Sequence, residues 1–193
     1  MEIKSILEEK KRLRRELTSI RNNLSEVELI TKSKNIVETL ISLDIYKKSD
    51  IIYSYGSFRS EVNTWQLNKT ILLNGKTLAL PKVLSGGYMQ FYKIPDLSKL
   101  IPGYMGILEP GPDCEEMSSD DTGLILVPGL GFDRMMYRIG YGGGFYDRYL
   151  QNTSVNNISC GLAFDEQIIS QVPRESTDFP LDFVLTESGI LKG

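Results

Sequence analysis

Apolar residues recur every three or four positions at the start of the chain, where they form the series Ile3, Ile6, Leu13, Leu17, Ile20 and Leu24. This spacing puts them on one side of an α-helix, so we predict a helix over residues 3–24. The series has one gap, at position 10, which holds a lysine. Because residues three or four apart share a helix face, Lys10 is expected to face the interior with Arg14 beside it.

A second helix is predicted from Ser25 onward. The sequence Ser25-Glu-Val-Glu28 has the form of a capping box, in which the serine and glutamate side chains satisfy backbone amides at the start of a helix. The apolar face of this helix is expected to consist of Leu29, Ile30, Ile36, Val37, Leu40 and Ile41.

The remainder of the chain alternates between short apolar runs and helical patterns. Strands are predicted over residues 51–55, 77–80, 88–93, 123–127, 158–164 and 183–186, and helices over 63–74 and 143–151. Pro81 is expected to end the second strand, and residues 94–122 are expected to form a long, partly irregular excursion. This alternation is typical of an α/β fold, so we predict a single domain over residues 1–193, with a mainly parallel sheet flanked by helices and an N-terminal helical pair.

Composition narrows the classes of function. The 193 residues carry a formal net charge of −3, which disfavours a dedicated nucleic-acid-binding protein. The N-terminus does not resemble a signal peptide, and no segment has the roughly 20 apolar residues of a membrane span. Two cysteines, Cys114 and Cys160, do not suggest a disulfide framework, so a cytoplasmic location is predicted. The chain has no histidine, so its chemistry must use carboxylates, lysine, arginine, tyrosine, serine, backbone amides or a hard cation.

A glycine-rich segment follows the predicted buried strand 123–127. It reads Arg138-Ile-Gly-Tyr-Gly-Gly-Gly-Phe-Tyr-Asp147 and leads into a predicted helix. Free amides at a helix N-terminus, with no side chains in the way, make a binding site for anions such as phosphate, and Arg138 adds a fixed positive charge. The segment is neither of the two common nucleotide fingerprints, since the chain lacks G-x-x-x-x-G-K-[ST] and position 145 is Phe. Taken alone, such a segment is more often a tight strand-to-helix connection than a catalytic loop.

The wider pattern resembles a known family. Leu126-Val-Pro-Gly-Leu-Gly-Phe-Asp133, followed by Tyr137-Arg-Ile-Gly-Tyr-Gly-Gly-Gly-Phe-Tyr-Asp-Arg148, is similar to the signature of 5-formyltetrahydrofolate cyclo-ligases. Further segments match that family in order and spacing: Lys10-Lys-Arg-Leu-Arg14, Glu61-Val-Asn-Thr64, Ile107-Leu-Glu-Pro110, Leu162-Ala-Phe164 with Gln167, and Asp182-Phe-Val-Leu-Thr-Glu187. The resemblance covers nearly the whole chain.

The resemblance implies an enzyme that uses ATP and Mg²⁺ to convert 5-formyltetrahydrofolate, with or without a polyglutamate tail, to 5,10-methenyltetrahydrofolate. It implies catalytic roles for Lys10 and Arg138, and metal ligands at Asp147 and Asp182. The implied ATP site comprises Lys10, Arg14, Arg138, Ile139, Gly140, Tyr141, Gly142, Gly143, Gly144, Phe145 and Tyr146. The implied folate site comprises Gly56, Glu61, Met105, Tyr141, Gly142, Gly143, Gly144 and Phe145.

Several of these residues also have a purely structural interpretation. Lys10 could extend to solvent, and Asp147 could simply complement a helix dipole. Asp182 could be a strand-edge or capping residue, and Glu61 a surface acid. The basic residues Lys11, Arg12 and Arg15 are expected to be solvated, and the aromatic residues Trp65, Tyr53 and Tyr55 to belong to the core.

Two further functions stay open at this point. A small-molecule kinase could use the same phosphate-binding loop on another substrate, and a non-catalytic folate- or nucleotide-binding regulator could keep the pocket without turnover. Two positions also depart from the usual family pattern, since Phe145 stands where many relatives have tyrosine and Met105 where many have an aromatic residue. We expect a monomer that binds ATP and the folate, with no nucleic-acid or membrane partner.

Overall fold

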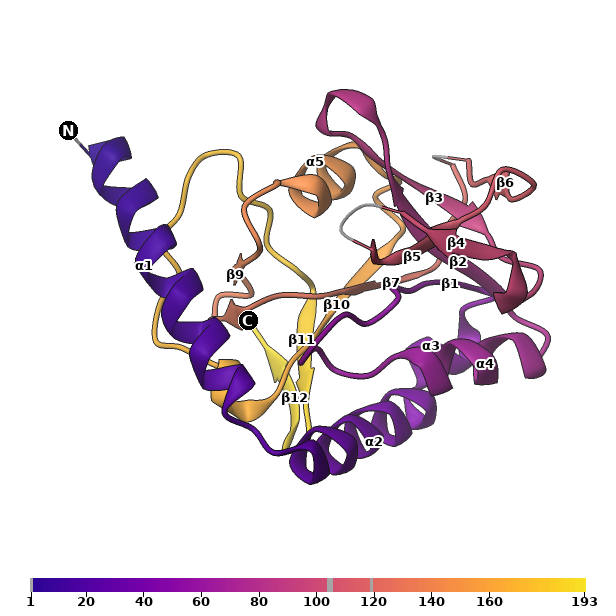
Figure 1. The fold of residues 1–193 in the computed structure, drawn as a ribbon, viewed down its shortest axis with the longest axis horizontal. Coiled ribbons are helices and arrows are strands. Elements are labelled where there is room, and N and C mark those ends of the chain that lie inside the picture. The colour runs from indigo at the N-terminus through magenta and orange to yellow at the C-terminus, as the bar shows by residue number, and fades with distance from the viewer. Residues whose placement is uncertain (1, 104–105, 119) are drawn as a thin grey trace.

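The computed structural model describes residues 2–103, 106–118 and 120–193. Its centre is an eight-stranded sheet with the order β12-β11-β10-β7-β1-β2-β3-β6 (Figure 1). The strands of this sheet are β1 (Ile51–Tyr53), β2 (Thr77–Val83), β3 (Met89–Lys93), β6 (Glu115–Glu116), β7 (Leu124–Val127), β10 (Ile158–Leu162), β11 (Phe183–Thr186) and β12 (Gly189–Lys192).

The five central strands, β11, β10, β7, β1 and β2, all run parallel, whereas β12, β3 and β6 pair antiparallel at the two edges. Every residue of β7 is buried, as expected for a parallel strand that is covered on both faces. The predicted α/β fold with a mainly parallel sheet is confirmed.

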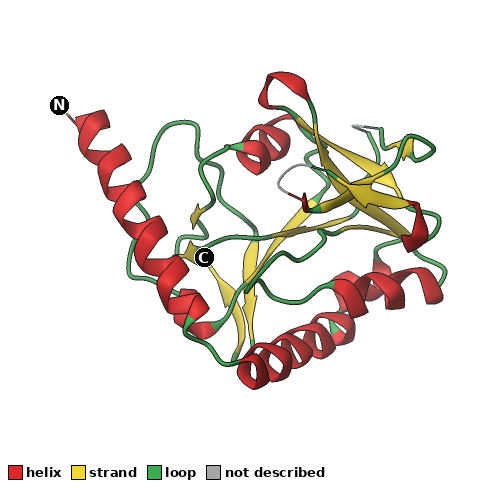
Figure 2. Ribbon diagram, in the orientation of Figure 1, coloured by secondary structure: helices red, strands yellow, loops and turns green. Residues whose placement is uncertain are grey.

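Helices cover both faces of the sheet (Figure 2). The helices α2 (Glu26–Ser42) and α4 (Trp65–Leu73) contribute to a core cluster that includes Leu40, Leu67 and Leu126. Helix α5 (Phe145–Asn152) lies over the opposite face, where Leu150 packs in a second cluster with Ile125 and Val127. The short helix α3 (Asp44–Lys48) connects α2 to β1. Among the described residues, no helix has the length and apolar character needed to span a membrane.

Helix α1 (Glu2–Asn22) runs along one side of the sheet (Figure 1). Its Leu17 packs in a small separate core with Leu130, Ile139 and Val172. The capping box predicted for the next helix is confirmed, since Ser25 and Glu28 exchange side-chain and backbone hydrogen bonds at the start of α2. The predicted apolar face of α2 is wrong at Ile30, which is exposed to solvent.

The structure corrects the prediction that Pro81 ends a strand, because β2 continues through it to Val83. The carbonyl of Ala79 faces β1 and accepts a hydrogen bond from Ser54, so the nitrogen of Pro81, two residues on, faces the same side. Strand β1 has already ended there, so the missing N–H removes no bond from the sheet, while Pro81 still pairs with Phe91 of β3.

Short strands were also missed by the sequence pattern. The region 94–122 contains the hairpin of β4 (Leu100–Pro102) and β5 (Leu108–Pro110), and also β6. The loop after β7 contains the hairpin of β8 (Gly131–Phe132) and β9 (Arg138–Ile139). The edge strand β12 was missed as well. These strands are two to four residues long, too short to show a periodicity.

The direction in which the chain progresses across the sheet reverses between β1 and β7. The chain leaves β1 through α4 on one face of the sheet and leaves β7 through α5 on the other. The loops that follow these two neighbouring strands therefore diverge from a common edge. In open α/β sheets, ligands bind at such a point, beyond the carboxyl ends of the strands.

Candidate functional site

Basic residues lie along the face of helix α1 that turns toward the protein. Lys10, Arg14, Leu17 and Arg21 follow one another at spacings of four, three and four residues, so they share that face. Lys10 is only 4% exposed and Arg21 only 2%. The predicted inward orientation of Lys10 is confirmed, and Lys11, Arg12 and Arg15 are exposed as predicted.

The ammonium group of Lys10 is held by two carboxylates. Its Nζ lies 2.7 Å from Glu175 Oε2 and 2.6 Å from Asp178 Oδ2. Both acids belong to the loop between β10 and β11. The alternative in which Lys10 extends to solvent is therefore wrong, because its charge is paired inside the structure.

Arg14 contacts the glycine-rich loop directly. Its Nε donates a hydrogen bond to the carbonyl of Gly140, 2.9 Å away. Gly142 and Gly144 have φ angles of +105° and +64°, which residues with side chains rarely adopt. A Cβ on Gly142 would also lie 3.4 Å from Arg14 Cζ. The loop thus depends on glycine for its backbone shape at both of these positions.

Arg138, the first residue of β9, is almost completely buried. Its Nη2 forms an ion pair of 3.0 Å with Asp147 Oδ1, and its Nη1 donates to the carbonyl of Phe179 at 3.2 Å. Burial lowers the pKa of Arg138, while the charge of Asp147 acts in the opposite direction. Asp147 lies in the first turn of α5 and also accepts a hydrogen bond from the Phe179 amide. The carboxylate therefore has a specific partner beyond the helix dipole.

The carboxylate of Glu61 is buried, which corrects the interpretation of this residue as a surface acid. Its Oε2 accepts a hydrogen bond from the Phe58 amide at 2.9 Å, and its Oε1 accepts one from the Tyr141 hydroxyl at 2.8 Å. The same hydroxyl lies 2.6 Å from Arg21 Nη2. Burial is the main cause of the raised pKa of Glu61, which the Phe58 amide, the Tyr141 hydroxyl and the charge of Arg21 partly offset.

Three more residues of the predicted ATP site, Tyr146, Ile139 and Phe145, differ in their surroundings. The hydroxyl of Tyr146 is buried and has no hydrogen-bond partner among the described residues. Burial raises its pKa, and the nearby charges of Glu61 and Arg138 act on it in opposite directions, which places this hydroxyl in the same region. Ile139 is buried in the small core beside α1, so its side chain has a packing role. Phe145 lies under the guanidinium of Arg148 and is partly exposed.

Gly56 lies in the loop that follows β1, on the way to Glu61. A Cβ at this position would lie 2.8 Å from the indole ring of Trp65, so the backbone packs closely against that side chain. Trp65 is only partly buried, whereas Tyr53 and Tyr55 belong to the core as predicted. Met105 lies outside the described residues.

Asp182 immediately precedes β11 and is exposed. Its Oδ2 accepts hydrogen bonds from the backbone amide and the hydroxyl of Ser159, both at 2.7 Å. This is the capping arrangement that the sequence left open as an alternative. Within the described ranges, no group of three or more histidine, cysteine, aspartate or glutamate side chains could hold a metal ion by itself.

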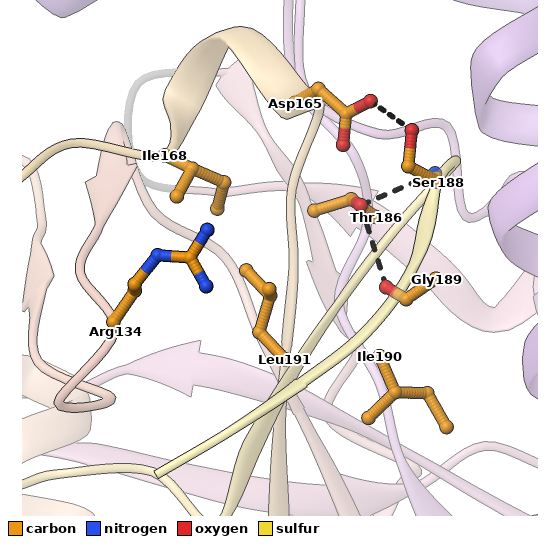
Figure 3. A pocket seen from close by; sticks show the side chains of 8 residues that line it. All are labelled: Arg134, Asp165, Ile168, Thr186, Ser188, Gly189, Ile190 and Leu191. Atoms are coloured by element: carbon orange, nitrogen blue, oxygen red, sulfur yellow. Dashed lines mark hydrogen bonds between the residues drawn. The ribbon is translucent and has the colours of Figure 1, made fainter.

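A hollow of about 290 Å³ lies elsewhere, between the β8–β9 turn and the turn that joins β11 to β12 (Figure 3). Arg134, Asp165, Ile168 and Ser188 are among the side chains that line it. It contains none of the predicted site residues. Around the glycine-rich loop, the predicted residues Arg14 and Glu61, together with Arg21, contact Gly140 and Tyr141. Asp182 is not among these contacts, because its carboxylate is bonded to Ser159.

Comparison with known proteins agrees with this arrangement. Residues 6–187 match the model of the 5-formyltetrahydrofolate cyclo-ligase family. The chain belongs to this family. The resemblance predicted from the glycine-rich signature is thereby confirmed, and the chain is assigned to a family of enzymes.

Individual relatives support the family over the full chain. The 5-formyltetrahydrofolate cyclo-ligase of Mus musculus is 32% identical over 189 residues, which cover 92% of this chain and 93% of the relative. That of Haemophilus influenzae is 28% identical, with coverage of 92% and 97%. An NMR structure of the 5,10-methenyltetrahydrofolate synthetase of Aquifex aeolicus matches with a TM-score of 0.85 and 34% identity, and covers 95% of this chain and 92% of that chain.

Sequence reasoning missed three charged residues that the structure places in this region: Arg21, Glu175 and Asp178. Arg21 could have been found, because it continues the spacing of Lys10, Arg14 and Leu17 on one helix face. The two acids could not, because their only visible feature is a short polar loop that has no periodicity.

Proposed function

We propose that this cyclo-ligase family member catalyses the ATP-dependent cyclisation of 5-formyltetrahydrofolate to 5,10-methenyltetrahydrofolate, with release of ADP and phosphate. The observation that carries the proposal is the hydrogen bond of 2.8 Å between Tyr141 and Glu61. It joins a glycine-rich loop suited to phosphate to a buried carboxylate suited to a pterin, although these residues are 80 positions apart in the sequence.

The nucleotide side of the site consists of Lys10, Arg14, Arg138 and the backbone of residues 139–146. Arg14 already contacts the loop, and the N-terminus of α5 directs free amides away from the helix, where they favour an anion. Lys10 and Arg138 are paired with carboxylates in this structure. We propose that phosphate oxygens of ATP become partners of these two cations when the nucleotide binds.

We assign Glu61, Gly56 and residues 141–145 to the folate side, and Met105, outside the described residues, stays a prediction from the family resemblance. An ionised carboxylate has about four lone-pair positions, and two of those on Glu61 are used by Phe58 and Tyr141. One position remains on each oxygen. A pterin ring presents an amino and an imino N–H side by side, which matches this pair of remaining acceptors.

In the proposed reaction, the N5-formyl oxygen attacks the γ-phosphorus of ATP, and the bond from that phosphorus to the bridging oxygen of ADP breaks. The product of this step is an imidate phosphate. N10 then attacks the formyl carbon and loses its proton to solvent, and the C–O bond to phosphate breaks to give the 5,10-methenyl cation. Such a transfer depends on positioning and on neutralising charge rather than on a strong base, so a chain without histidine can perform it.

We propose that Asp147 and Asp182 hold Mg²⁺ together with phosphate oxygens of the nucleotide. Magnesium commonly uses one or two carboxylates and completes its coordination with water and substrate phosphates, so a protein cage of three acids is not required. Asp147 fits this role, because Arg138 and the Phe179 amide both contact Oδ1 and leave Oδ2 for the metal. Asp182 also has one oxygen, Oδ1, outside its contacts with Ser159. When bound, the ion would neutralise charge on the phosphates.

The deciding experiment mixes purified protein with 5-formyltetrahydrofolate and MgATP. We expect the absorbance of the methenyl product to appear together with one equivalent of ADP. ADP release with other acceptors but no methenyl product would favour a small-molecule kinase. Binding of both compounds without ADP release would leave a non-catalytic regulator. The cytoplasmic location and the monomeric state also stay predictions, and the second is checked by size-exclusion chromatography with light scattering.

A substitution tests the metal assignment. Asp147→Asn keeps the shape of the side chain but removes its charge, so we expect turnover to lose its dependence on Mg²⁺ and to fall at least about 100-fold. The same change leaves Arg138 without its ionic partner, and a loss of roughly 1–3 kcal/mol in the free energy of unfolding is expected. Asp44→Asn, at an exposed position on α3, is the matched control. An Asp147→Asn variant with an unchanged magnesium dependence would exclude this residue as a ligand.

A further inference from the structure

Arg21 is a buried cation whose contacts come from three different segments of the chain. Its Nε donates to Ser60 Oγ at 3.1 Å, its Nη1 to the carbonyl of Gly129 at 3.2 Å, and its Nη2 to Tyr141 Oη at 2.6 Å. None of these acceptors carries a charge. Removing a guanidinium from water is costly, so a side chain that is 2% exposed without a direct carboxylate partner needs a specific explanation.

The direction of the hydrogen bonds around Tyr141 follows from the chemistry of the groups. Arginine can only donate, so the Tyr141 oxygen accepts from Arg21. A phenol has one proton, and the remaining contact of this hydroxyl is Glu61 Oε1. The proton is therefore donated to the carboxylate, and the three groups form a chain of hydrogen bonds with a single polarity.

We propose that Arg21 is a positioning residue for folate recognition, which acts through the Tyr141 hydroxyl to hold the Glu61 carboxylate and to tie it to the nucleotide-binding loop. This inference rests on the proposed function, because it assumes that Glu61 binds the pterin. Arg21 itself donates to Ser60, Gly129 and Tyr141, and its connection to Glu61 runs through the Tyr141 hydroxyl. Its role is to hold the Glu61 carboxylate in the orientation that the pterin needs. Because the connection runs through Tyr141, that orientation also depends on the position of the glycine-rich loop.

The exposure of Tyr141 supports this role over one in core packing. Its side chain is among the exposed large hydrophobic residues, at 55%, yet its hydroxyl reaches inward to two buried groups. Removing the hydroxyl takes away a single oxygen atom and leaves the ring, which is largely at the surface, in place. A Tyr141→Phe variant should fold, and any effect on the substrate should come from the lost hydrogen bonds.

The charged and titratable groups near Glu61 determine how its pKa changes when the Tyr141 hydroxyl or the Arg21 charge is removed. Arg21 comes from α1, Tyr141 from the glycine-rich loop, Tyr55 from the segment after β1, and Tyr146 from α5. Burial raises the pKa of Tyr141 to about 12, so the phenol stays protonated and donates throughout the working range. The Tyr141 hydroxyl and the Arg21 charge both lower the pKa of Glu61, against the larger effect of burial. Removing either one should make Glu61 harder to ionise.

The test compares Tyr141→Phe, Arg21→Gln and Arg21→Lys with the parent protein. A hydrogen bond to a charged group is worth about tenfold in binding or more, so Tyr141→Phe should raise KM for 5-formyltetrahydrofolate roughly tenfold. KM for ATP should change less than about threefold. The acidic limb of the pH profile of kcat/KM for the folate should move to higher pH. Arg21→Gln should give the same pattern, and Arg21→Lys, which keeps the charge, should leave the acidic limb closer to that of the parent.

Controls separate this role from a structural one. Tyr53→Phe also removes a hydroxyl, one that donates to the carbonyl of Asp121 at 3.1 Å, and should leave both KM values and the pH profile unchanged. The double variant Tyr141→Phe/Arg21→Gln should show less than the product of the single effects, because both act through one chain of hydrogen bonds. If Arg21→Gln does not fold, Tyr141→Phe decides the question alone.

Two outcomes would overturn the proposal. One is a folded Tyr141→Phe protein with the parent's KM for the folate and an unmoved acidic limb. The other is an equal rise of KM for ATP and folate, which would show that the variant distorts the loop rather than Glu61. Failure of the proposed function is recognised separately, because the unmodified protein would then produce no methenyl product at all.

Discussion

The glycine at position 142 offers a sharp test of how the nucleotide loop depends on its backbone. Gly142 has a φ of +105°, and a Cβ there would lie 3.4 Å from the guanidinium carbon of Arg14. We therefore predict that Gly142→Ala destabilises the protein and also weakens ATP binding. The two effects have different origins, since the first is backbone strain and the second is displacement of the amides that we propose face the phosphates.

The size of the effect follows from the conformation. Holding a residue with a side chain in such a region costs about 1–3 kcal/mol. The contact with Arg14 adds little, because that side chain can shift by a few tenths of an ångström. In a chain of this size, about 1 kcal/mol corresponds to a change of about 2–4 °C in Tm, so a fall of several degrees is expected.

Two other glycines provide matched controls. Gly75 has a φ of +70°, a methyl group added there would meet no atom within 4 Å, and the residue lies after α4, away from the site. Gly75→Ala should cost about 1–2 kcal/mol and leave KM for ATP unchanged. Gly140 has no positive φ and no atom within 4 Å either, so Gly140→Ala should be as stable as the parent or up to about 1 kcal/mol more stable.

The assay combines thermal unfolding with steady-state kinetics at varied ATP. Gly142→Ala should show both a lower Tm and a KM for ATP raised at least about tenfold. The reasoning would be refuted if Gly142→Ala melted at the same temperature as Gly140→Ala, since the positive φ would then carry no cost. It would also fail if Gly75→Ala lost as much affinity for ATP, because loss of stability alone would then explain the kinetics.

Two further predictions concern buried charges. Lys10→Met should reduce the free energy of unfolding, measured by urea titration, by about 1–3 kcal/mol, because Glu175 and Asp178 lose their cation. The loss is limited because these two side chains keep 29% and 15% exposure to water. Unchanged stability would contradict the pairing. Glu61→Gln should abolish folate turnover, yet it should stabilise the fold increasingly as the pH rises above 4.5, the ordinary pKa of this carboxyl group. The pKa of Glu61 is raised in the folded state, so the folded protein binds this proton more tightly than the unfolded chain, and the parent loses stability as the pH rises through that pKa. A Tm difference between variant and parent that does not change with pH would argue against this sign.

The sequence predicted correctly the helices and strands that are specified by residues close together in the chain. The helical stripe with a lysine at position 10, the capping box at Ser25 and the buried strand before Gly129 were all confirmed. Hydrophobic periodicity and capping are local effects, so they are visible in a single chain. Pro81 and the short strands were mispredicted. Whether a proline or a run of two to four residues joins the sheet depends on the strand beside it, which the local sequence does not show.

The family signature predicted that the glycine-rich loop, Glu61 and the basic helix belong to one site, and the hydrogen-bond partners of these groups came only from the tertiary structure. The sequence does not show that Lys10 meets Glu175 and Asp178, which are 165 and 168 positions away. Nor does it show that Arg21 reaches Glu61 through Tyr141. Such contacts depend on the order of the strands, which brings the loops after β1 and β7 together while α1 packs across them. The residue types that could do the chemistry are thus present in the sequence, and the hydrogen bonds that orient them arise from the fold.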